Sequence, residues 1–170
     1  MTDTKWTGGC QCGAVRYEFS VKPDNPCLCH CRMCQKQVGN FFGAYAGSHT
    51  DNFRVTRGQI AHFRSSADAL RGFCRDCGTP LAYYFLSQPR IDVTIGSLDR
   101  YAEFKPIRNI GAEGMAPWWG EVAHLPTMST GEVDAYGDTA ERFEKIRASN
   151  RQHPDHGTDR WPPAPGEPFH

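Results

Sequence analysis

The sequence lacks a net charge, a long apolar run and an apolar segment near its amino terminus. Its 19 basic and 19 acidic side chains cancel at neutral pH, so no whole-chain field attracts nucleic acid or an anionic membrane. No stretch approaches the roughly 20 apolar residues that a membrane-spanning helix needs. Residues 1–9 do not form the apolar core of a secretory signal. We therefore expect no nucleic-acid partner, no membrane partner and a cytoplasmic location.

Cysteine is what this chain of 170 residues has in an informative pattern. A disulfide framework is disfavoured, because a reducing compartment keeps thiols free. The dense run over residues 27–34 also leaves few pairs with the spacing that a bridge requires. The spacing therefore favours metal binding. The eight cysteines are Cys10, Cys12, Cys27, Cys29, Cys31, Cys34, Cys74 and Cys77.

Two short cysteine pairs predict a closed zinc site. They are Cys10-Gln11-Cys12-Gly13 and Cys74-Arg75-Asp76-Cys77-Gly78, and each is followed by a glycine that permits a tight turn. Zinc binds four thiolates on a tetrahedron at about 2.3 Å, and a short-range pair supplies two corners. Cys10, Cys12, Cys74 and Cys77 together predict a structural zinc site that stabilises folding.

A third cluster, Cys29-His30-Cys31-Arg32-Met33-Cys34, places three thiolates in one short segment. Three protein ligands and one exchangeable position are typical of catalytic zinc. Two alternatives remain at this point. Cys27 or His30 supplies a fourth ligand and closes the site, or the thiols form a redox cluster without metal.

These segments resemble the glutathione-dependent formaldehyde-activating enzyme family, which includes the centromere protein V type zinc domains. Order and spacing agree over roughly residues 5–130, and we expect residues 131–170 to form a short helix and a proline-rich tail. The matching segments are Gly8-Gly9-Cys10-Gln11-Cys12-Gly13-Ala14-Val15, Cys29-His30-Cys31-Arg32-Met33-Cys34 with Gly39, Arg64-Ser65-Ser66, Arg71-Gly72-Phe73-Cys74-Arg75-Asp76-Cys77-Gly78, and Gly96-Ser97-Leu98-Asp99.

The resemblance implies a mainly β fold of the β-tent (Mss4-like) type, with short antiparallel strands around zinc. It implies two zinc ions per chain, a structural one on the two pairs and a catalytic one on Cys29, Cys31 and Cys34. It also implies a carbon–sulfur lyase that joins glutathione to formaldehyde, giving S-(hydroxymethyl)glutathione. Cys27 falls outside the family's ligands, and Asn109 stands where the family often has a histidine. If that position contacts substrate, the substrate or the activity differs.

The residues also predict local structure. Period-two alternation predicts a strand over residues 15–21 and another over 91–95, and an apolar run predicts a central strand over 81–86. Residues 53–55 and 59–64 are expected to be neighbouring strands.

Helix signals are few in this sequence. A turn or two is expected after Cys34, and a charged helix over residues 139–148 with Thr139 as its cap. The tail beyond it is expected to be mobile or to lie over the surface. Its three histidines, His153, His156 and His170, are expected to be solvated.

Substrate contacts are predicted from charge and ring chemistry. Phe41, Phe42 and Tyr45 either wall a pocket or belong to the core, and Trp118-Trp119 carry the same two interpretations. His30 either moves a proton or orients its loop. A different class of function, a non-catalytic zinc-stabilised module that binds a protein, stays open because fold does not fix function. The candidates for binding the carboxylates of glutathione are Arg32, Lys36, Arg64 and Arg71.

Overall fold

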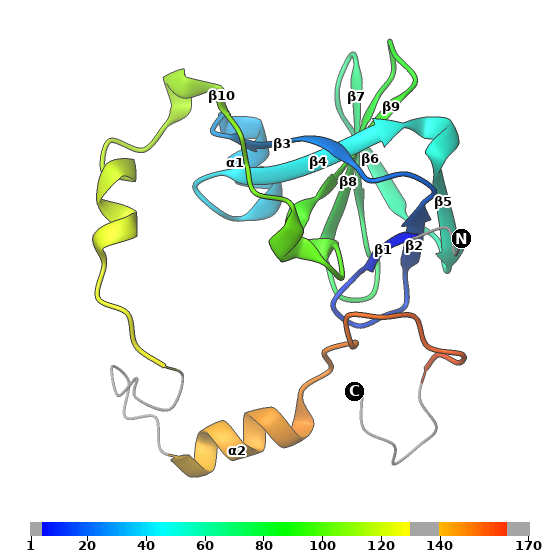
Figure 1. The fold of residues 1–170 in the computed structure, drawn as a ribbon, viewed down its shortest axis with the longest axis vertical. Coiled ribbons are helices and arrows are strands. Elements are labelled where there is room, and N and C mark those ends of the chain that lie inside the picture. Colours follow the sequence, from blue (N-terminus) through cyan, green and yellow to red (C-terminus); the bar gives the residue numbers. More distant parts are fainter. Residues whose placement is uncertain (1–4, 130–139, 163–170) are drawn as a thin grey trace.

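Short β-strands dominate the computed structural model, which describes residues 5–129 and 140–162 (Figure 1). A three-stranded antiparallel sheet has the order β1-β2-β5, with β1 Trp6–Gly9, β2 Arg16–Phe19 and β5 Phe53–Arg57. A seven-stranded sheet has the order β10-β3-β4-β9-β8-β7-β6. Its strands are β3 Asp24–Cys29, β4 Gly43–His49, β6 Ala61–Ser66, β7 Ala69–Phe73, β8 Pro80–Phe85, β9 Arg90–Thr94 and β10 Asn109–Ile110. The predicted mainly β fold is confirmed.

Helical structure is limited to short segments. Helix α1 spans Arg32–Val38, so it begins before Cys34 and contains it, where the sequence predicted a turn after it. Helix α2 spans Ala140–Ser149, close to the predicted helix, and the expected cap Thr139 lies outside the described residues. None of the described helices is long and apolar enough to cross a membrane. The 3-10 helices are η1 Thr50–Asn52, η2 Ile95–Ser97, η3 Tyr101–Glu103, η4 Ala112–Gly114 and η5 Trp119–His124.

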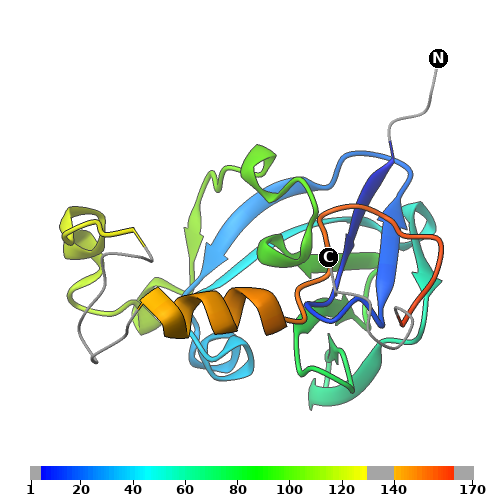
Figure 2. The same ribbon diagram turned by 90° about the horizontal axis from the view of Figure 1, so that it is seen from below.

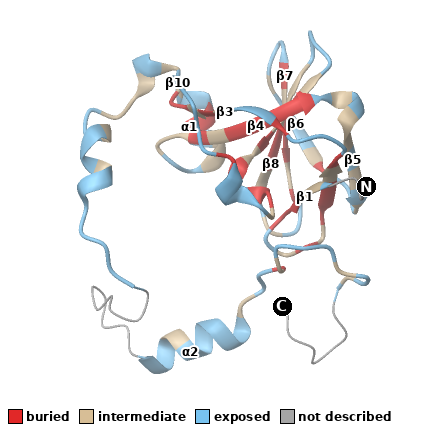
Figure 3. Cartoon of the chain, in the orientation of Figure 1, coloured by how far each residue is buried: buried red, intermediate tan, exposed pale blue. Residues whose placement is uncertain are grey.

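The two faces of the larger sheet have different surroundings. Along β9, Ile91 and Val93 are fully buried on the face that packs into the main core, together with Tyr17 of the smaller sheet. Directly paired residues of a sheet point to the same face. The alternate residue Asp92 pairs with Tyr83 on β8, so both side chains belong to the opposite face. Figure 3 shows the buried residues gathered in the strands, while α2 is largely exposed.

The expectation that residues 53–55 and 59–64 form neighbouring strands is wrong. Strand β5 pairs with β2 in the smaller sheet, whereas β6 pairs with β7 in the larger one. The chain changes sheets at Gly58, whose φ of 65° is left-handed and whose backbone lies close to the Ala14 carbonyl. Ile60 is then buried beneath Gly72. Burial of Ile60 therefore separates two strands that are adjacent in sequence.

The segment after α2, residues 150–162, packs against the folded domain, and we call it the C-terminal strap. Figures 1 and 2 both show it beside the end of the β1–β2 hairpin. His153 is only 3% exposed, so the expectation that it is solvated is wrong, and its backbone N–H donates to the Gln11 carbonyl at 2.7 Å. His156 is exposed as expected, and His170 lies outside the described residues.

Candidate metal centres

The first candidate metal centre is formed by the two predicted cysteine pairs. The Sγ atoms of Cys10, Cys12, Cys74 and Cys77 all lie within 4.8 Å of one another. The Cys10 and Cys12 sulfurs are 3.6 Å apart, and those of Cys12 and Cys74 are 4.0 Å apart. A tetrahedron with metal–sulfur bonds of about 2.3 Å has edges of about 3.8 Å. The four sulfurs therefore fit a single tetrahedral metal ion.

Two glycines shape the loops that carry these cysteines. Gly13 and Gly78 each follow the second cysteine of a pair, with φ values of 77° and 75°. Their N–H groups donate to the carbonyls of Cys10 and Cys74, each at 3.0 Å. Each bond closes a tight turn that brings its pair of sulfurs to one side.

Protons compete with a metal at this centre. Burial raises the pKa of Cys10, and it raises the pKa of Cys12 to about 11. Burial opposes ionisation of Cys77 as well, but hydrogen bonds, above all from the Thr79 hydroxyl at 3.1 Å, lower the pKa of Cys77 to about 6. Metal binding must therefore displace protons from the buried thiols, and its affinity falls as the pH falls.

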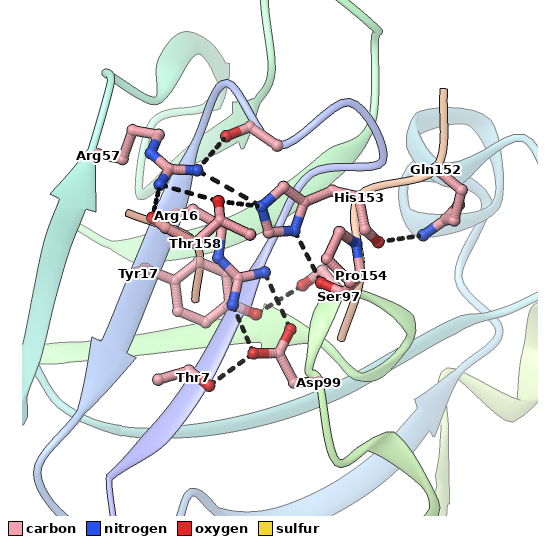
Figure 4. A network of polar contacts seen from close by, with 11 residues as sticks. Thr7, Arg16, Tyr17, Arg57, Ser97, Asp99, Gln152, His153, Pro154 and Thr158 are labelled. Atoms are coloured by element: carbon pink, nitrogen blue, oxygen red, sulfur yellow. Dashed lines mark hydrogen bonds and ion pairs between the residues drawn. The ribbon is translucent and has the colours of Figure 1, made fainter. Parts of the chain in front are cut away.

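The C-terminal strap braces one of these loops (Figure 4). The His153 ring lies over Gly13, where an added Cβ would stand 2.1 Å from the ring. Arg57 donates to the Gly13 carbonyl at 3.3 Å and to the Thr158 carbonyl, and the Thr158 hydroxyl is 3.0 Å from His153 Nε2. The strap is thereby tied to the loop that presents Cys12.

A buried ion pair also stabilises the region around the first centre. Arg16 on β2 forms a two-point ion pair with Asp99, one of its contacts being 2.9 Å, and both side chains are almost fully buried. The Tyr17 hydroxyl contacts Ser97 Oγ at 2.7 Å (Figure 4). The sequence assigned no structural role to the segment Gly96-Ser97-Leu98-Asp99. Its contacts join the smaller sheet to the end of β9.

The second candidate metal centre joins the end of β3 to the start of α1. Cys29 ends β3, Cys31 precedes α1, and Cys34 lies in the first turn of the helix. The three Sγ atoms lie within 4.8 Å of one another, with Cys29 and Cys31 3.4 Å apart. They can occupy three corners of a metal tetrahedron.

A buried cation stands beside this second group of thiols. Arg71 is 2% exposed, and its Nη2 donates to Cys34 Sγ at 3.5 Å. Its Cζ lies over the Tyr83 ring, 4.9 Å from the ring centre. A hydrogen bond from Cys29 lowers the pKa of Cys34 to about 5, and Arg71 adds to this against the opposing effect of burial. The same contact raises the pKa of Cys29. One thiolate is therefore stabilised before any metal binds.

A cavity of about 180 Å³ opens next to the second centre. Its walls are mostly apolar and aromatic, and Asp92 and Arg71 supply its charged groups. Tyr45 lines this cavity, as one of the two interpretations of this aromatic group predicted. Phe41 packs against Trp118 and Phe42 against Trp119, outside this cavity. The lining residues are Cys27, Cys29, Cys31, Met33, Cys34, Tyr45, Arg71, Tyr83, Phe85, Asp92 and Ile110.

The two residues considered as a fourth ligand are placed apart from the three sulfurs. Cys27 is buried and lines the cavity, but it is not part of the group of converging ligand atoms. His30 is fully buried beside Trp119, with ring centres 4.8 Å apart, and its Nε2 is 3.0 Å from Asn109 Oδ1. Its Nδ1 has no hydrogen-bond partner within residues 5–129 and 140–162. Asn109, which lies on β10, therefore contacts the buried side chain of His30.

The predicted carboxylate-binding residues lie in different places. Arg71 is buried and bonds to protein groups, as described above. Arg32 donates to Gln35 at 2.6 Å, Arg64 donates to the Ala67 carbonyl at 2.7 Å, and both are exposed, as is Lys36. None of these three lines the cavity among the described residues.

Sequence reasoning did not single out Asp92 and Tyr83, which do line the cavity. The alternation along residues 91–95 placed Asp92 opposite the core face. It could not show that side chains of β3 and α1 line a cavity with Asp92 on that face.

Comparisons with known proteins agree with this arrangement. The family model for glutathione-dependent formaldehyde-activating enzymes matches residues 5–113, which is more than half of the chain. An uncharacterized lyase of Schizosaccharomyces pombe is 28% identical over 82 residues, a match that covers 48% of this chain and 58% of that protein. The chain thus matches little more than half the length of this curated relative. A crystal structure of a Rhodobacter sphaeroides protein shares the fold with a TM-score of 0.50 and 23% identity, over 61% of this chain and 98% of that one. The chain belongs to the glutathione-dependent formaldehyde-activating enzyme family.

Proposed function

We propose that this chain is a zinc-dependent carbon–sulfur lyase-like enzyme of a reducing cytoplasm that acts on a small thiol/aldehyde adduct. The reaction is the joining of glutathione and formaldehyde to S-(hydroxymethyl)glutathione, or its reverse. One zinc ion is held by Cys10, Cys12, Cys74 and Cys77, and a second by Cys29, Cys31 and Cys34. The observation that carries the proposal is a set of three converging thiols that borders a cavity and has no fourth ligand within residues 5–129 and 140–162.

The chemistry divides between the metal and the chain. Zinc at the second centre supplies an exchangeable position that favours a thiolate and polarises a carbonyl. Cys29, Cys31 and Cys34 would hold the ion at the edge of the cavity, where a substrate can reach it. Arg71 balances the negative charge that the three thiolates bring into a buried region. The aromatic walls formed by Tyr45, Tyr83 and Phe85 exclude water and restrict the orientation of the two reactants.

The size of the cavity limits how much substrate it encloses. Pockets that enclose a whole drug-sized ligand have volumes of about 300–1,000 Å³. A cavity of about 180 Å³ holds the sulfur, the aldehyde carbon and their immediate neighbours, while part of a tripeptide thiol remains at the rim. Met33 and Ile110 line the cavity and are exposed, so they form part of that rim.

A binding module of the same fold would need neither an exchangeable metal position nor a cavity beside it. In such a module, a fourth protein ligand would close the second centre. The positions of Cys27 and His30, outside the group of converging sulfurs, support the enzyme over the module.

Exchange NMR of a mixture of glutathione, formaldehyde and their adduct tests the proposal. We expect the zinc-loaded protein to accelerate the exchange beyond the spontaneous rate, and Cys31→Ser to abolish that acceleration. Cys27→Ser is the matched control, because it removes a buried cavity thiol that is not among the converging ligands. A wild-type sample with two zinc ions per chain and no acceleration would contradict the proposed reaction.

A further inference from the structure

Among the described residues that line the cavity beside the second centre, Asp92 supplies the one carboxylate. Arg71 donates from each of its three guanidinium nitrogens, to Ser65, Tyr45 and Cys34. Asp92 differs, because Arg90 Nε donates to its Oδ1 at 2.9 Å but its Oδ2 accepts no bond from the described residues. The Asp92 side chain is 19% exposed. A carboxylate oxygen is therefore left for a ligand in the cavity.

The sheet makes room for this carboxylate. Asp92 pairs with Gly47 on β4, and a Cβ added to Gly47 would stand 1.9 Å from Asp92 Oδ1. On its other side Asp92 pairs with Tyr83, which in turn pairs with Arg71. The carboxylate thus lies between a position without a side chain and an aromatic ring, on the cavity face of the sheet.

We propose that Asp92 binds the ammonium group of the thiol substrate, so that the preferred thiol carries a cationic amino group remote from its sulfur. An ionised carboxylate only accepts hydrogen bonds, so it selects a donor and repels a carboxylate. The γ-glutamyl end of glutathione carries such an ammonium group. This inference rests on the proposed function and names a specificity-determining residue for it.

Distance separates the ammonium group from the neutral donors of the adduct, which are its hydroxyl and its two amide N–H groups, three and four bonds from the sulfur. Asp92 and Arg71 lie two strands apart, which places their backbones about 10 Å from each other. In glutathione the ammonium nitrogen is eight bonds from the sulfur, a reach of about 9 Å when extended. The hydroxyl of the adduct is bonded to the carbon next to the sulfur. Of these donors, only the ammonium group lies far enough from the sulfur to cross a separation of about two strands.

Calorimetric titration of the zinc-loaded protein with two matched thiols tests this inference. The thiols are glutathione and glutaryl-cysteinylglycine, which lacks only the α-ammonium group. We expect wild-type protein to bind glutathione about tenfold more tightly, as one charge-assisted hydrogen bond provides. Asp92→Asn should bring the ratio of the two affinities to about one. Asp24→Asn should keep the tenfold ratio, because Asp24 shares Arg90 at 2.8 Å but does not line the cavity.

Each other outcome overturns the inference in a distinguishable way. Equal affinities in wild-type protein would contradict a role for the ammonium group and leave the proposed reaction standing. A ratio that survives in Asp92→Asn, with turnover lost, would assign Asp92 to the hydroxyl of the adduct instead. Binding of neither thiol, together with no acceleration of exchange, would contradict the proposed function itself. The wild-type ratio tests the inference even if Asp92→Asn folds poorly.

Discussion

The two cysteine centres use the same ligand atoms in different surroundings. The first joins two pairs that are more than 60 residues apart in the chain, and Cys10 and Cys74 are almost fully buried. The second takes its three thiols from the single segment Cys29–Cys34. The strap covers a loop of the first centre, and a cavity lies beside each centre, one lined by Cys10 and Cys77 and the other by all three thiols of the second centre. The two centres therefore differ in the number of converging thiols and in the elements that cover them, not in the type of ligand.

Charge distinguishes the centres as well. A divalent ion with four thiolates carries two formal negative charges, and with three thiolates it carries one. At the second centre Arg71 offsets that single charge by direct contact with Cys34. Arg57, at the first centre, instead bonds to the backbone of the loop and the strap. An incoming thiolate is therefore easier to accommodate at the second centre.

The largest expected difference between the centres is in folding. Cys74→Ser removes a ligand that joins distant parts of the chain, and structural zinc contributes about 10–16 kcal/mol in small zinc domains. We expect this variant to lose cooperative thermal unfolding, as measured by circular dichroism. Cys31→Ser should unfold cooperatively and retain one metal ion per chain, measured by atomic emission. Loss of the fold in Cys31→Ser, or two metal ions in Cys74→Ser, would reverse the assignment of the two centres.

The next largest effect concerns Arg71 and Arg64, two of the residues that the sequence predicted to bind carboxylates. Arg71→Met leaves the Cys34 thiolate without its buried counter-charge, and breaking such a pair costs about 3–5 kcal/mol. Arg64→Met alters an exposed side chain and should change the free energy of unfolding by less than about 0.5 kcal/mol. Urea unfolding measures both. Equal effects of the two substitutions would show that Arg71 does not stabilise the second centre.

A smaller effect is expected from the glycines of the first centre. Gly13→Ala and Gly78→Ala each force alanine into a left-handed conformation, at a cost of about 1–2 kcal/mol. Only Gly13→Ala also pushes against the His153 ring, since nothing lies within 4 Å of a Cβ at Gly78. We expect Gly13→Ala to cost about 1–3 kcal/mol more and to release metal faster to a chelator. Identical release rates from the two variants would mean that the strap does not brace the centre.

Local patterns were enough to predict much of this molecule. Cysteine spacing identified both groups of converging thiols, because two cysteines separated by one or two residues can face one ion only from a tight turn. Period-two alternation placed β2 and β9 near their observed ranges, and a continuous apolar run did the same for β8. Both signals depend on residues that are close in the sequence.

What the sequence did not predict depends on contacts between distant segments. β5 pairs with β2 in one sheet, and Ile60, which follows β5, is buried beneath Gly72 in the other. The cavity needs β3, β4, β7, β8 and β9 side by side, so the place of Asp92 in it could not be read from its neighbours. His153 was expected to be solvated because its segment is polar, but its ring fills the space over Gly13. A composition rule cannot detect a single buried contact of this kind.

The smallest expected effect is a dependence of strap docking on pH. Burial lowers the pKa of His153 below its ordinary value of about 6.5, so the released strap binds more protons than the docked one. Docking is therefore favoured above about pH 6.5 and weakens as the pH falls below it. We expect limited proteolysis to cut the strap faster at pH 5.5 than at pH 7.5 in wild-type protein. His153→Gln cannot titrate but keeps the same cysteines, so comparing the two proteins at each pH cancels the effect of acid on the metal centres. If the wild-type and variant rates change in parallel with pH, protonation of His153 does not release the strap.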